Sequence, residues 1–345
     1  MQDESSPKQS TTRHRILLAL TYLVSFGSLY WAIRDTKLAE LREDIATMDW
    51  PWVALAVVAE LSVFFWHAWR WTLVLRPVTK VAYWDALRAV YVGLFANEIL
   101  PFRVGEVIRC YLLGKWVGQP FSVVLASWLI ERIFDGIWLS IGMFIVVKMF
   151  VWPPELRYVV DGAYALFILV FAGALALTVA MFQKRRFAVM ENEPRWRRTL
   201  RVLMDDLSLI GHSRYLYFAA AVSLPFLMIQ VLPIYFAMRG YGFELSVWNA
   251  VVLMIILRLG SVPPQAPGNI GIFQLLTRLT LEKIFLVVPG DAARFSLVLW
   301  AIVTLPLLLG GFIAMLVTGS RLDQIRAGAS SARMQAKSER SNEIS

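Results

Sequence analysis

Four charged residues lie close together in a stretch of this chain that is otherwise apolar. Directly after Asn97 the sequence holds two acids and two arginines: Glu98, Arg103, Glu106 and Arg109. An ionised side chain at the centre of a membrane helix costs about 2.5–3.5 kcal/mol, so these groups must pair, meet water or meet a ligand. Pro101 and Gly105 break the helix, and a second helix starting near Gly105 would direct free backbone amides at the break. With Arg103, this outlines a site for a phosphate-type anion.

The same residues also allow a purely structural interpretation. Glu106 and Arg109 are three residues apart, a spacing at which opposite charges on one helix can pair. They would then form an ion-pair knot that holds a helical hairpin together. Contact with an anionic headgroup and a structural knot both stay open, and the first is our working hypothesis.

A second charged cluster, Glu131-Arg132-Ile133-Phe134-Asp135, lies in the next apolar run. Glu131 and Asp135 share a helical face, and Arg132 can pair with Asp135. We interpret the acids either as counter-charges for Arg103 or Arg109, or as a proton relay, or as a salt bridge that supports the fold. Two carboxylates one turn apart also resemble an acid–base pair, but no nucleophile or metal set accompanies them. The chain is therefore not expected to be an enzyme, and no cofactor or metal is expected.

A third group surrounds a segment rich in proline and glycine. Arg258 precedes this segment, and its candidate site residues are Pro267, Gly268, Asn269 and Gly271. The prolines at 263, 264 and 267 cannot continue a helix. Non-helical backbone at membrane depth must line a polar cavity or be buried in protein. We assign Arg258 to the anion site, whereas Arg278 is expected to pair locally with Glu282.

The apolar run 51–75 carries three further polar residues. His67 could sense protons, although we expect it to be a satisfied interior contact. Arg70 is expected to extend its charged end towards the cytoplasmic interface. Glu60 lies deep enough in the run to be a candidate partner for an arginine.

The composition indicates a membrane protein. Of the 345 residues, 58% are hydrophobic and 17% are charged, whereas soluble domains have about 45–50% and 25%. This excludes a soluble enzyme and a disordered chain, and the single cysteine, Cys110, excludes a disulfide-rich module. The net charge of +9 does not indicate nucleic acid, because lysine and arginine gather in short segments between apolar runs, as in cytoplasmic loops.

Six apolar runs are long enough to cross a bilayer, which requires about 20 residues. They are 16–33, 51–75, 119–152, 158–182, 215–238 and 292–318. Two more runs, 84–118 and 247–288, are broken near the middle, and each is expected to be a re-entrant hairpin that enters and leaves by the same face. The sequence thus predicts an all-α, polytopic integral membrane protein with about six full spans and two broken re-entrant helical hairpins.

The order of these elements repeats along the membrane domain, 16–320. A span, a broken hairpin and a span occupy 51–152 and again 215–318, and both hairpin centres read Pro-x-x-x-Gly. With the tails 1–15 and 321–345 in the cytoplasm, the basic loop 183–214 and the other basic clusters fall on one side. The two halves then start on opposite sides of the membrane and would be inverted repeats. Paired broken segments in inverted repeats point to a transport site near the bilayer midplane.

Three motifs, in order along the chain, resemble a known family. They are Leu94 to Glu106 followed by Arg109 and Tyr111, Ala126-Ser127 with Glu131 to Gly136, and Pro264 through Gly271 with Phe273. Over about 16–320 the chain resembles the lysylphosphatidylglycerol synthase transmembrane-region family. The resemblance implies a lipid-translocating protein in the cytoplasmic membrane of a bacterium or archaeon.

The resemblance has two limits. In the two-part members of that family, this region flips an aminoacylated phospholipid that a soluble aminoacyl-transferase domain makes. No such domain is expected here, since only the tail 321–345 follows the last span. In addition, Gln274 stands where the family's pattern leads us to expect an acid, so a mechanism that needs a carboxylate there is in doubt.

The predicted function is therefore the flipping of an anionic or phosphate-bearing lipid, either a membrane phospholipid or a polyprenyl-phosphate-linked lipid. Arg103, Arg109 and Arg258 would meet the phosphate. The acids that would balance them in the empty site are Glu98, Glu106, Glu131 and Asp135. The alternatives are a secondary transporter of a soluble anion and a non-transporting partner of a lipid-modifying enzyme or glycosyltransferase.

Overall fold

The computed structural model of the chain describes residues 22–34, 37–100, 104–149, 157–182, 207, 210, 213–261 and 266–319. None of these residues forms a strand, so the predicted all-α class is confirmed. A first helix, Tyr22–Ile33, precedes the labelled ones. The others are α2 (Leu38–Thr47), α3 (Trp50–Leu75), α4 (Tyr83–Ile99), α5 (Gly105–Val117), α6 (Phe121–Met149), α7 (Arg157–Phe182), α9 (Arg214–Ile229), α10 (Val231–Gly240), α11 (Val247–Gly260), the 3-10 turn η3 (Pro267–Asn269), α12 (Ile272–Lys283) and α13 (Pro289–Thr318).

Three of the expected spans are helices long and apolar enough to cross a membrane: Trp50–Leu75, Arg214–Gly240 and Pro289–Thr318. The second consists of α9 and α10, which meet at Gln230. Pro233 explains the interruption, because it has no N–H to donate to the carbonyl of Ile229 four residues earlier. The expected run 119–152 corresponds to α6, which has 29 residues and carries its charged cluster in its first half.

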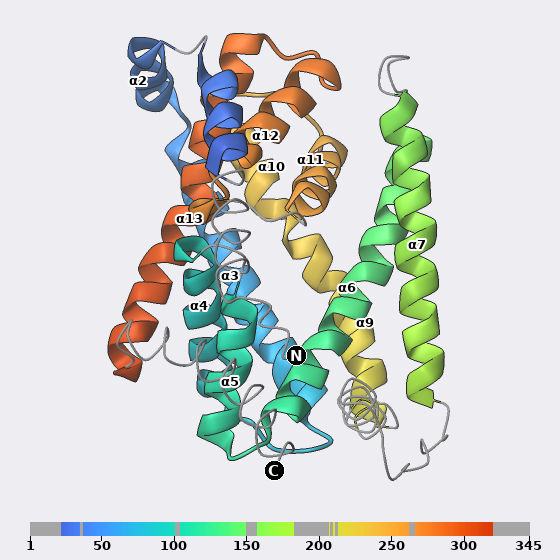
Figure 1. Cartoon of the computed structure of the whole chain (residues 1–345). Helices are drawn as coiled ribbons and strands as arrows, with labels where there is room; N and C mark the ends of the chain where they lie inside the picture. Colours follow the sequence, from blue (N-terminus) through green and yellow to red (C-terminus); the bar gives the residue numbers. More distant parts are fainter. Residues whose placement is uncertain are drawn as a thin grey trace, which may run out of the picture.

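Both runs predicted to be broken are hairpins of short helices. The arms α4, α5, α11 and α12 have 17, 13, 14 and 12 residues. At 1.5 Å per residue they are about 18–26 Å long, shorter than the roughly 30 Å hydrocarbon core. The α4–α5 hairpin lies in the lower half of the molecule and the α11–α12 hairpin in the upper half (Figure 1). The two hairpins therefore occupy opposite ends of the bundle, as inverted repeats require.

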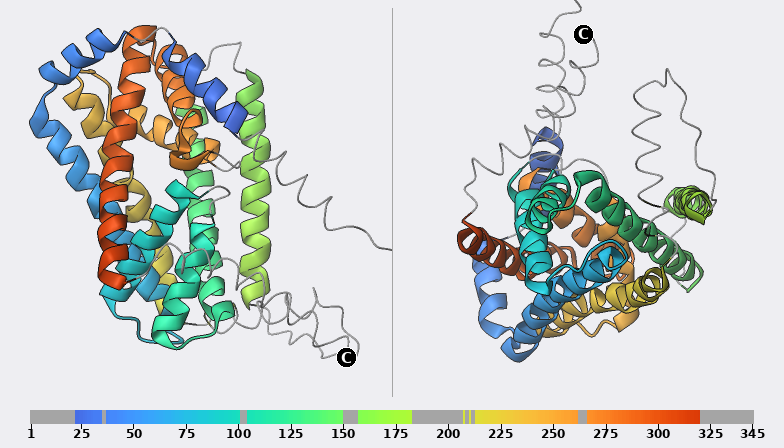
Figure 2. Two further views of the ribbon diagram at one scale, coloured as in Figure 1. Left: turned by 60° about the vertical axis from the view of Figure 1, so that its left-hand side comes forward. Right: turned by 90° about the horizontal axis from the view of Figure 1, so that it is seen from below.

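The helix contacts of the two halves correspond. In each half the hairpin packs on the span before it, as α4 does on α3 and α11 on α10. The span after each hairpin crosses to the other half: α13 packs against α4 and α3, and α6 packs against α11 and α9. Because α6 and α13 each pack against the other half, they join the two repeats into one bundle. The helix α7 stands at the edge of this bundle beside α6 (Figure 2).

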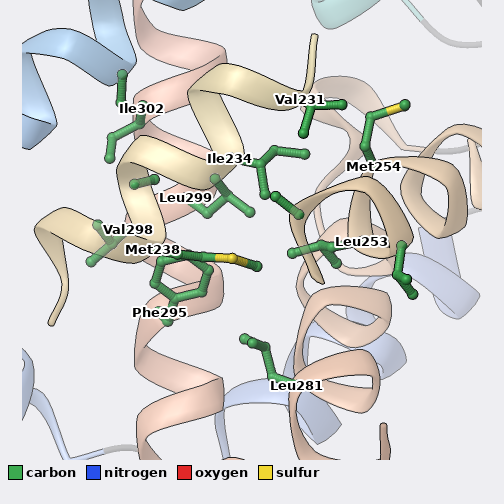
Figure 3. Close-up of a cluster of buried hydrophobic side chains, with 14 of the residues drawn as sticks. Val231, Ile234, Met238, Leu253, Met254, Leu281, Phe295, Val298, Leu299 and Ile302 are labelled. Carbon is green, nitrogen blue, oxygen red and sulfur yellow. The ribbon is translucent and has the colours of Figure 1, made fainter. Parts of the chain in front are cut away.

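Apolar packing around α10 forms the largest core. Val231, Ile234 and Met238 of α10 face Leu253 and Met254 of α11, Leu281 of α12, and Phe295 and Leu299 of α13 (Figure 3). This cluster fixes the span α10 against the second hairpin.

Two elements outside the repeats attach to the second half through polar contacts. The Arg278 guanidinium of α12 donates to the carbonyls of Trp31 and Ala32, 2.9 and 3.0 Å away, at the end of the first helix. It also pairs with Glu282 at 3.3 Å, which confirms the local pair expected from the sequence. The helix α2, in a segment for which the sequence predicted only mixed charge, is attached by Glu40 and Asp44, each 2.5 Å from Arg294 of α13.

Tyr241, just past the end of α10, completes the contact with α2. Its hydroxyl donates to the Asp44 carboxylate that also binds Arg294. Burial and this hydrogen bond raise the pKa of Tyr241, so the hydroxyl keeps its proton and stays a donor.

Close approach of α4 and α5 depends on glycine, and substitution of Gly105 should test this. A Cβ on Gly105 would lie 1.8 Å from the Gly93 carbonyl oxygen. We expect Gly105→Ala to lower the free energy of unfolding by about 1–3 kcal/mol, because overpacking forces the two helices apart. The measurement is a denaturant titration of the purified protein in micelles. Gly173→Ala in α7 is the control, since nothing lies within 4 Å of its added Cβ, and equal destabilisation by both variants would contradict the packing argument.

Candidate functional site

A carboxylate on α6 is the centre of a buried charge network. Glu131 is fully buried and accepts hydrogen bonds from Arg70 of α3 at 3.3 Å and from Arg109 of α5 at 3.2 Å. His67 of α3 places its Nε2 atom 3.5 Å from the same carboxylate. Three helices, α3, α5 and α6, therefore meet at one acid. The sequence identified Glu131 as a candidate but not this combination of partners.

Arg70 is placed differently from the expectation. The sequence suggested that it extends to the cytoplasmic interface, which is wrong: its side chain is fully buried. It donates to Asp135 as well as Glu131, and its Nη1 atom lies 3.2 Å from the Ser223 hydroxyl of α9. The guanidinium carbon also lies 4.2 Å from the centre of the Phe226 ring. Two acids on α6, one turn apart, hold this arginine inside the bundle instead of letting it reach water.

Arg109 is equally enclosed. Its side chain has an exposed fraction of 0% and lies 2.8 Å from Glu106 and 3.2 Å from Glu131. The Nη1 atom contacts Nε2 of His67 at 2.9 Å, and the ring of Trp71 lies 4.6 Å from the guanidinium carbon. The pair with Glu106 matches the structural interpretation of this spacing. Contact between Arg109 and an anion stays a prediction, and in this conformation acids occupy the place of that anion.

The outer side of the network is more open. The side chains of Glu106, Asp135 and Arg132 have exposed fractions of 22%, 25% and 37%. Arg132 pairs with Asp135 at 3.1 Å, and Trp128 donates to Glu106 at 2.8 Å. Asn97 of α4 donates to Glu106 at 3.4 Å. We call Glu106, Arg132, Asp135 and Asn97 the rim of the network.

Two buried polar atoms of the rim have no hydrogen-bond partner among the described residues. They are Oδ1 of Asn97 and Nε of Arg132. A buried donor or acceptor without a partner costs about 1–3 kcal/mol. The rim therefore offers a donor and an acceptor to a polar ligand.

The tips of the two hairpins meet. Glu98, at the end of α4, accepts a hydrogen bond of 3.2 Å from the Asn269 side chain in η3. The hairpins come from opposite ends of the bundle (Figure 1), so this contact joins the repeats within the molecule. The sequence placed both residues in the candidate site, and the structure brings these two together.

The second tip keeps its shape by backbone geometry. Pro267 starts η3, and Gly268, Asn269 and Gly271 all have positive φ angles, of 72°, 52° and 94°. Trp300 of α13 donates to the Gly268 carbonyl at 2.8 Å. The Gly271 N–H donates to the Gln274 side-chain oxygen at 2.7 Å. An amide oxygen at Gln274 thus holds the start of α12 without adding a charge.

Arg258 is an exposed arginine of the second half. It lies at the end of α11 and donates to the side chain of Gln230, where α9 and α10 meet. Glu60, buried on α3, interacts with Arg258 electrostatically. Gln230 was not recognised in the sequence, although a polar residue inside the run 215–238 signals a buried contact.

The candidate residues thus form two groups. The network and its rim unite Glu106, Arg109, Glu131, Arg132, Asp135 and Asn97, while the tips unite Glu98 with Pro267, Gly268, Asn269 and Gly271. Arg258 lies apart from the network, beside Gln230. Arg103 lies outside the described residues. His67 and Arg70, three residues apart on α3, complete the network, and their spacing on one helical face was the available signal.

Comparison with known proteins finds matches over most of the chain. A family described as lysylphosphatidylglycerol synthase TM region matches residues 18–311. A protein of Methanothermobacter thermautotrophicus named UPF0104 membrane protein is 23% identical over 303 residues, which are 81% of this chain and 87% of that protein. A second protein of the same name and organism is 30% identical over 125 residues, 35% of this chain and 32% of that protein. Both groups of candidate residues lie inside the family match.

Removal of the charge of Glu131 should destabilise the protein. We expect Glu131→Gln to lower the free energy of unfolding by about 3–5 kcal/mol, because it leaves two buried guanidinium groups short of one counter-charge. The matched control is Asp85→Asn, which removes a carboxylate from a partly exposed pair with Arg88 and should cost less than about 1 kcal/mol. Denaturant titration in micelles compares the two. A cost for Glu131→Gln as small as that of the control would mean that Glu131 does not hold the network.

Proposed function

This chain belongs to the lysylphosphatidylglycerol synthase transmembrane-region family, and we propose that it moves an anionic, phosphate-bearing lipid from one leaflet of the membrane to the other. The family and the apolar helices make it a membrane protein of a family tied to lipid handling. The step from lipid handling to flipping is our proposal, and it rests on the arrangement of the hairpins.

The observation that carries the proposal is the contact between the hairpin tips. Glu98 and Asn269 meet at 3.2 Å, although one belongs to the lower hairpin and the other to the upper hairpin (Figure 1). Polar groups at the tips of two opposed hairpins give a headgroup partners part-way through the membrane. This hydrogen bond joins the Glu98 carboxylate to the neutral Asn269 amide, so a headgroup can separate these two side chains without breaking an ion pair between them.

Each half also offers a cationic group. Arg258 is exposed at the end of α11 in the second hairpin, and Arg132 of α6 is partly exposed on the rim near the first. Guanidinium groups suit a phosphate because they donate several hydrogen bonds in a fixed plane. The acids Glu98, Glu106 and Asp135 balance these arginines when no lipid is bound. Arg103 is assigned to the same role from its sequence position.

The outer surface suits a route in which the acyl chains stay in the bilayer. Large apolar side chains on α13, such as Leu305, Leu309 and Leu316, are more than half exposed. They give a lipid-facing wall along the helix that packs against the first hairpin. A headgroup could then follow the polar tips while its acyl chains remain in hydrocarbon, which avoids the cost of exposing those chains to water.

We further propose that the protein works in the cytoplasmic membrane of a prokaryote, with both termini in the cytoplasm. The lipid is a phospholipid or a polyprenyl-phosphate-linked lipid, since both carry the phosphate that the arginines suit. A soluble anion would use the same arginines, and this alternative is separated from lipid flipping by the assay below. A purely structural network would fit a non-transporting partner of a lipid-modifying enzyme or glycosyltransferase.

Transport should depend on Arg258. In phosphatidylcholine liposomes with a trace of short-chain fluorescent phosphatidylglycerol, we expect the protein to equilibrate the probe between leaflets, as measured by back-extraction with albumin. Arg258→Gln should slow this at least about tenfold, because a hydrogen bond to a charged group is worth roughly 1.5–3 kcal/mol. Arg88→Gln is the control, since Arg88 pairs with Asp85 outside the site.

The outcomes separate the three functions. Probe movement no faster than in empty liposomes would overturn lipid flipping. Slowing of the probe by soluble glycerol phosphate, with uptake of that anion, would favour the secondary transporter. Equal rates for wild type and Arg258→Gln, both folded, would remove Arg258 from the site.

A further inference from the structure

One nitrogen atom in the buried network faces two partners of opposite charge. Nε2 of His67 lies 2.9 Å from Nη1 of Arg109 and 3.5 Å from Oε2 of Glu131. The same Glu131 oxygen also accepts a hydrogen bond from Nη2 of Arg109, at 3.2 Å. His67 and Arg109 are therefore placed to compete for a single carboxylate oxygen.

The protonation state of His67 decides this competition. Arginine can only donate hydrogen bonds, so the contact at 2.9 Å requires Nε2 of His67 to accept. The ring is then neutral, with its proton on Nδ1. If a proton binds to the lone pair of Nε2, this atom becomes a donor, loses its hydrogen bond from Arg109 and gains one to Glu131. The new positive charge also repels the Arg109 guanidinium.

We propose that a proton on His67 releases Arg109 to the phosphate of the lipid headgroup, so that one proton crosses the membrane with each lipid. This inference rests on the proposed flipping function and adds its energy source. It also explains how Arg109 can be buried and still bind an anion. Acids enclose Arg109 in the unloaded state, and it becomes free to bind the anion when His67 is charged.

The charges around His67 support a one-to-one ratio. Arg70 faces it from its own helix, Arg109 and Glu106 from α5, and Glu131 from α6. From α9 come the Phe226 ring, whose centre lies 5.4 Å away, and the Ser223 hydroxyl next to Arg70. Across the whole network, Arg70, Arg109 and Arg132 balance Glu106, Glu131 and Asp135. One added proton leaves one positive charge, which a phosphate monoanion neutralises. The loaded state is then as neutral as the empty one.

The released guanidinium has a route to the open side. Arg109 keeps its pair with Glu106, at 2.8 Å, and the Glu106 side chain is 22% exposed on the rim. Arg132 lies on this rim with a buried Nε atom that makes no hydrogen bond to a described residue. A phosphate there would meet Arg132 and the released Arg109 together. His67 is thus a positioning residue, and the two arginines are the groups that contact the lipid.

A pH gradient across liposomes tests the inference. The vesicles are phosphatidylcholine with a trace of short-chain fluorescent phosphatidylglycerol, and empty vesicles under the same gradient correct for passive movement. With one proton per lipid, a gradient of one pH unit should drive the probe to about a tenfold excess in the leaflet facing the alkaline side. Because the loaded state is neutral, a potassium diffusion potential at equal pH should leave the two leaflets equal.

His67→Gln removes the titrating group and keeps a side chain that can accept from Arg109. We expect this variant to give no pH-driven excess, with leaflets that differ by less than twofold. His212→Gln, at a histidine in the basic loop 183–214, should accumulate the probe like wild type. A second measurement does not require transport: short-chain phosphatidylglycerol added to protein in weakly buffered detergent should cause uptake of about one proton per lipid bound by wild type and none by His67→Gln.

The results distinguish this inference from the flipping function on which it rests. If wild type does not move the probe even without a gradient, flipping itself is wrong. If wild type equilibrates the probe but shows no excess under the gradient, flipping stands and proton coupling is overturned. An excess or a proton uptake that persists in His67→Gln overturns the role of His67.

Discussion

The first half of this protein is organised by the cost of a charge inside hydrocarbon. Arg70 and Arg109 are both fully buried, and neither could stay there without a nearby carboxylate. Glu131 serves both, so α3, α5 and α6 cannot separate without stranding a charge. Apolar packing holds the second hairpin (Figure 3), and the first hairpin has an apolar core as well, to which the ion pairs add a link to two spans at once.

The same constraint is met differently in the second half, although the helix contacts of the two halves correspond. The tip of the second hairpin uses neutral groups: the Asn269 amide, the Gln274 amide and the hydroxyl of Ser25, which accepts from the Ala266 N–H at 3.2 Å. Gly271 allows the first helix to approach so closely that a Cβ there would lie 1.8 Å from the Ser25 carbonyl oxygen. The repeats therefore share an architecture but not a chemistry. The titratable groups of the network all belong to the first repeat.

Much of the fold could be predicted because membrane spans are set by length and apolar composition, which are local properties. The predicted run 51–75 is α3 to within one residue, and the breaks fall where proline and glycine stop a helix. The pairs Glu106–Arg109, Arg132–Asp135 and Arg278–Glu282 were also predictable from spacing. The partners of Arg70 were not, because it lies 61 residues from Glu131 and nothing local indicates which acid it meets. For the same reason the sequence could not show that the tips meet through Glu98 and Asn269, 171 residues apart.

An asymmetric distribution of charge has a consequence for how such a protein could do work. If both repeats carried equivalent titratable groups, a proton bound from either side would favour neither conformation, since inverted repeats exchange their roles when the protein changes its open side. Here His67, the fully buried Arg70 and Arg109, and the acids that bind them all lie in the first repeat, on α3, α5 and α6. A proton therefore changes the stability of one hairpin's contacts and leaves the other's unchanged. Under the proposed coupling, this difference is what lets a pH gradient act on the position of one hairpin relative to the rest of the bundle.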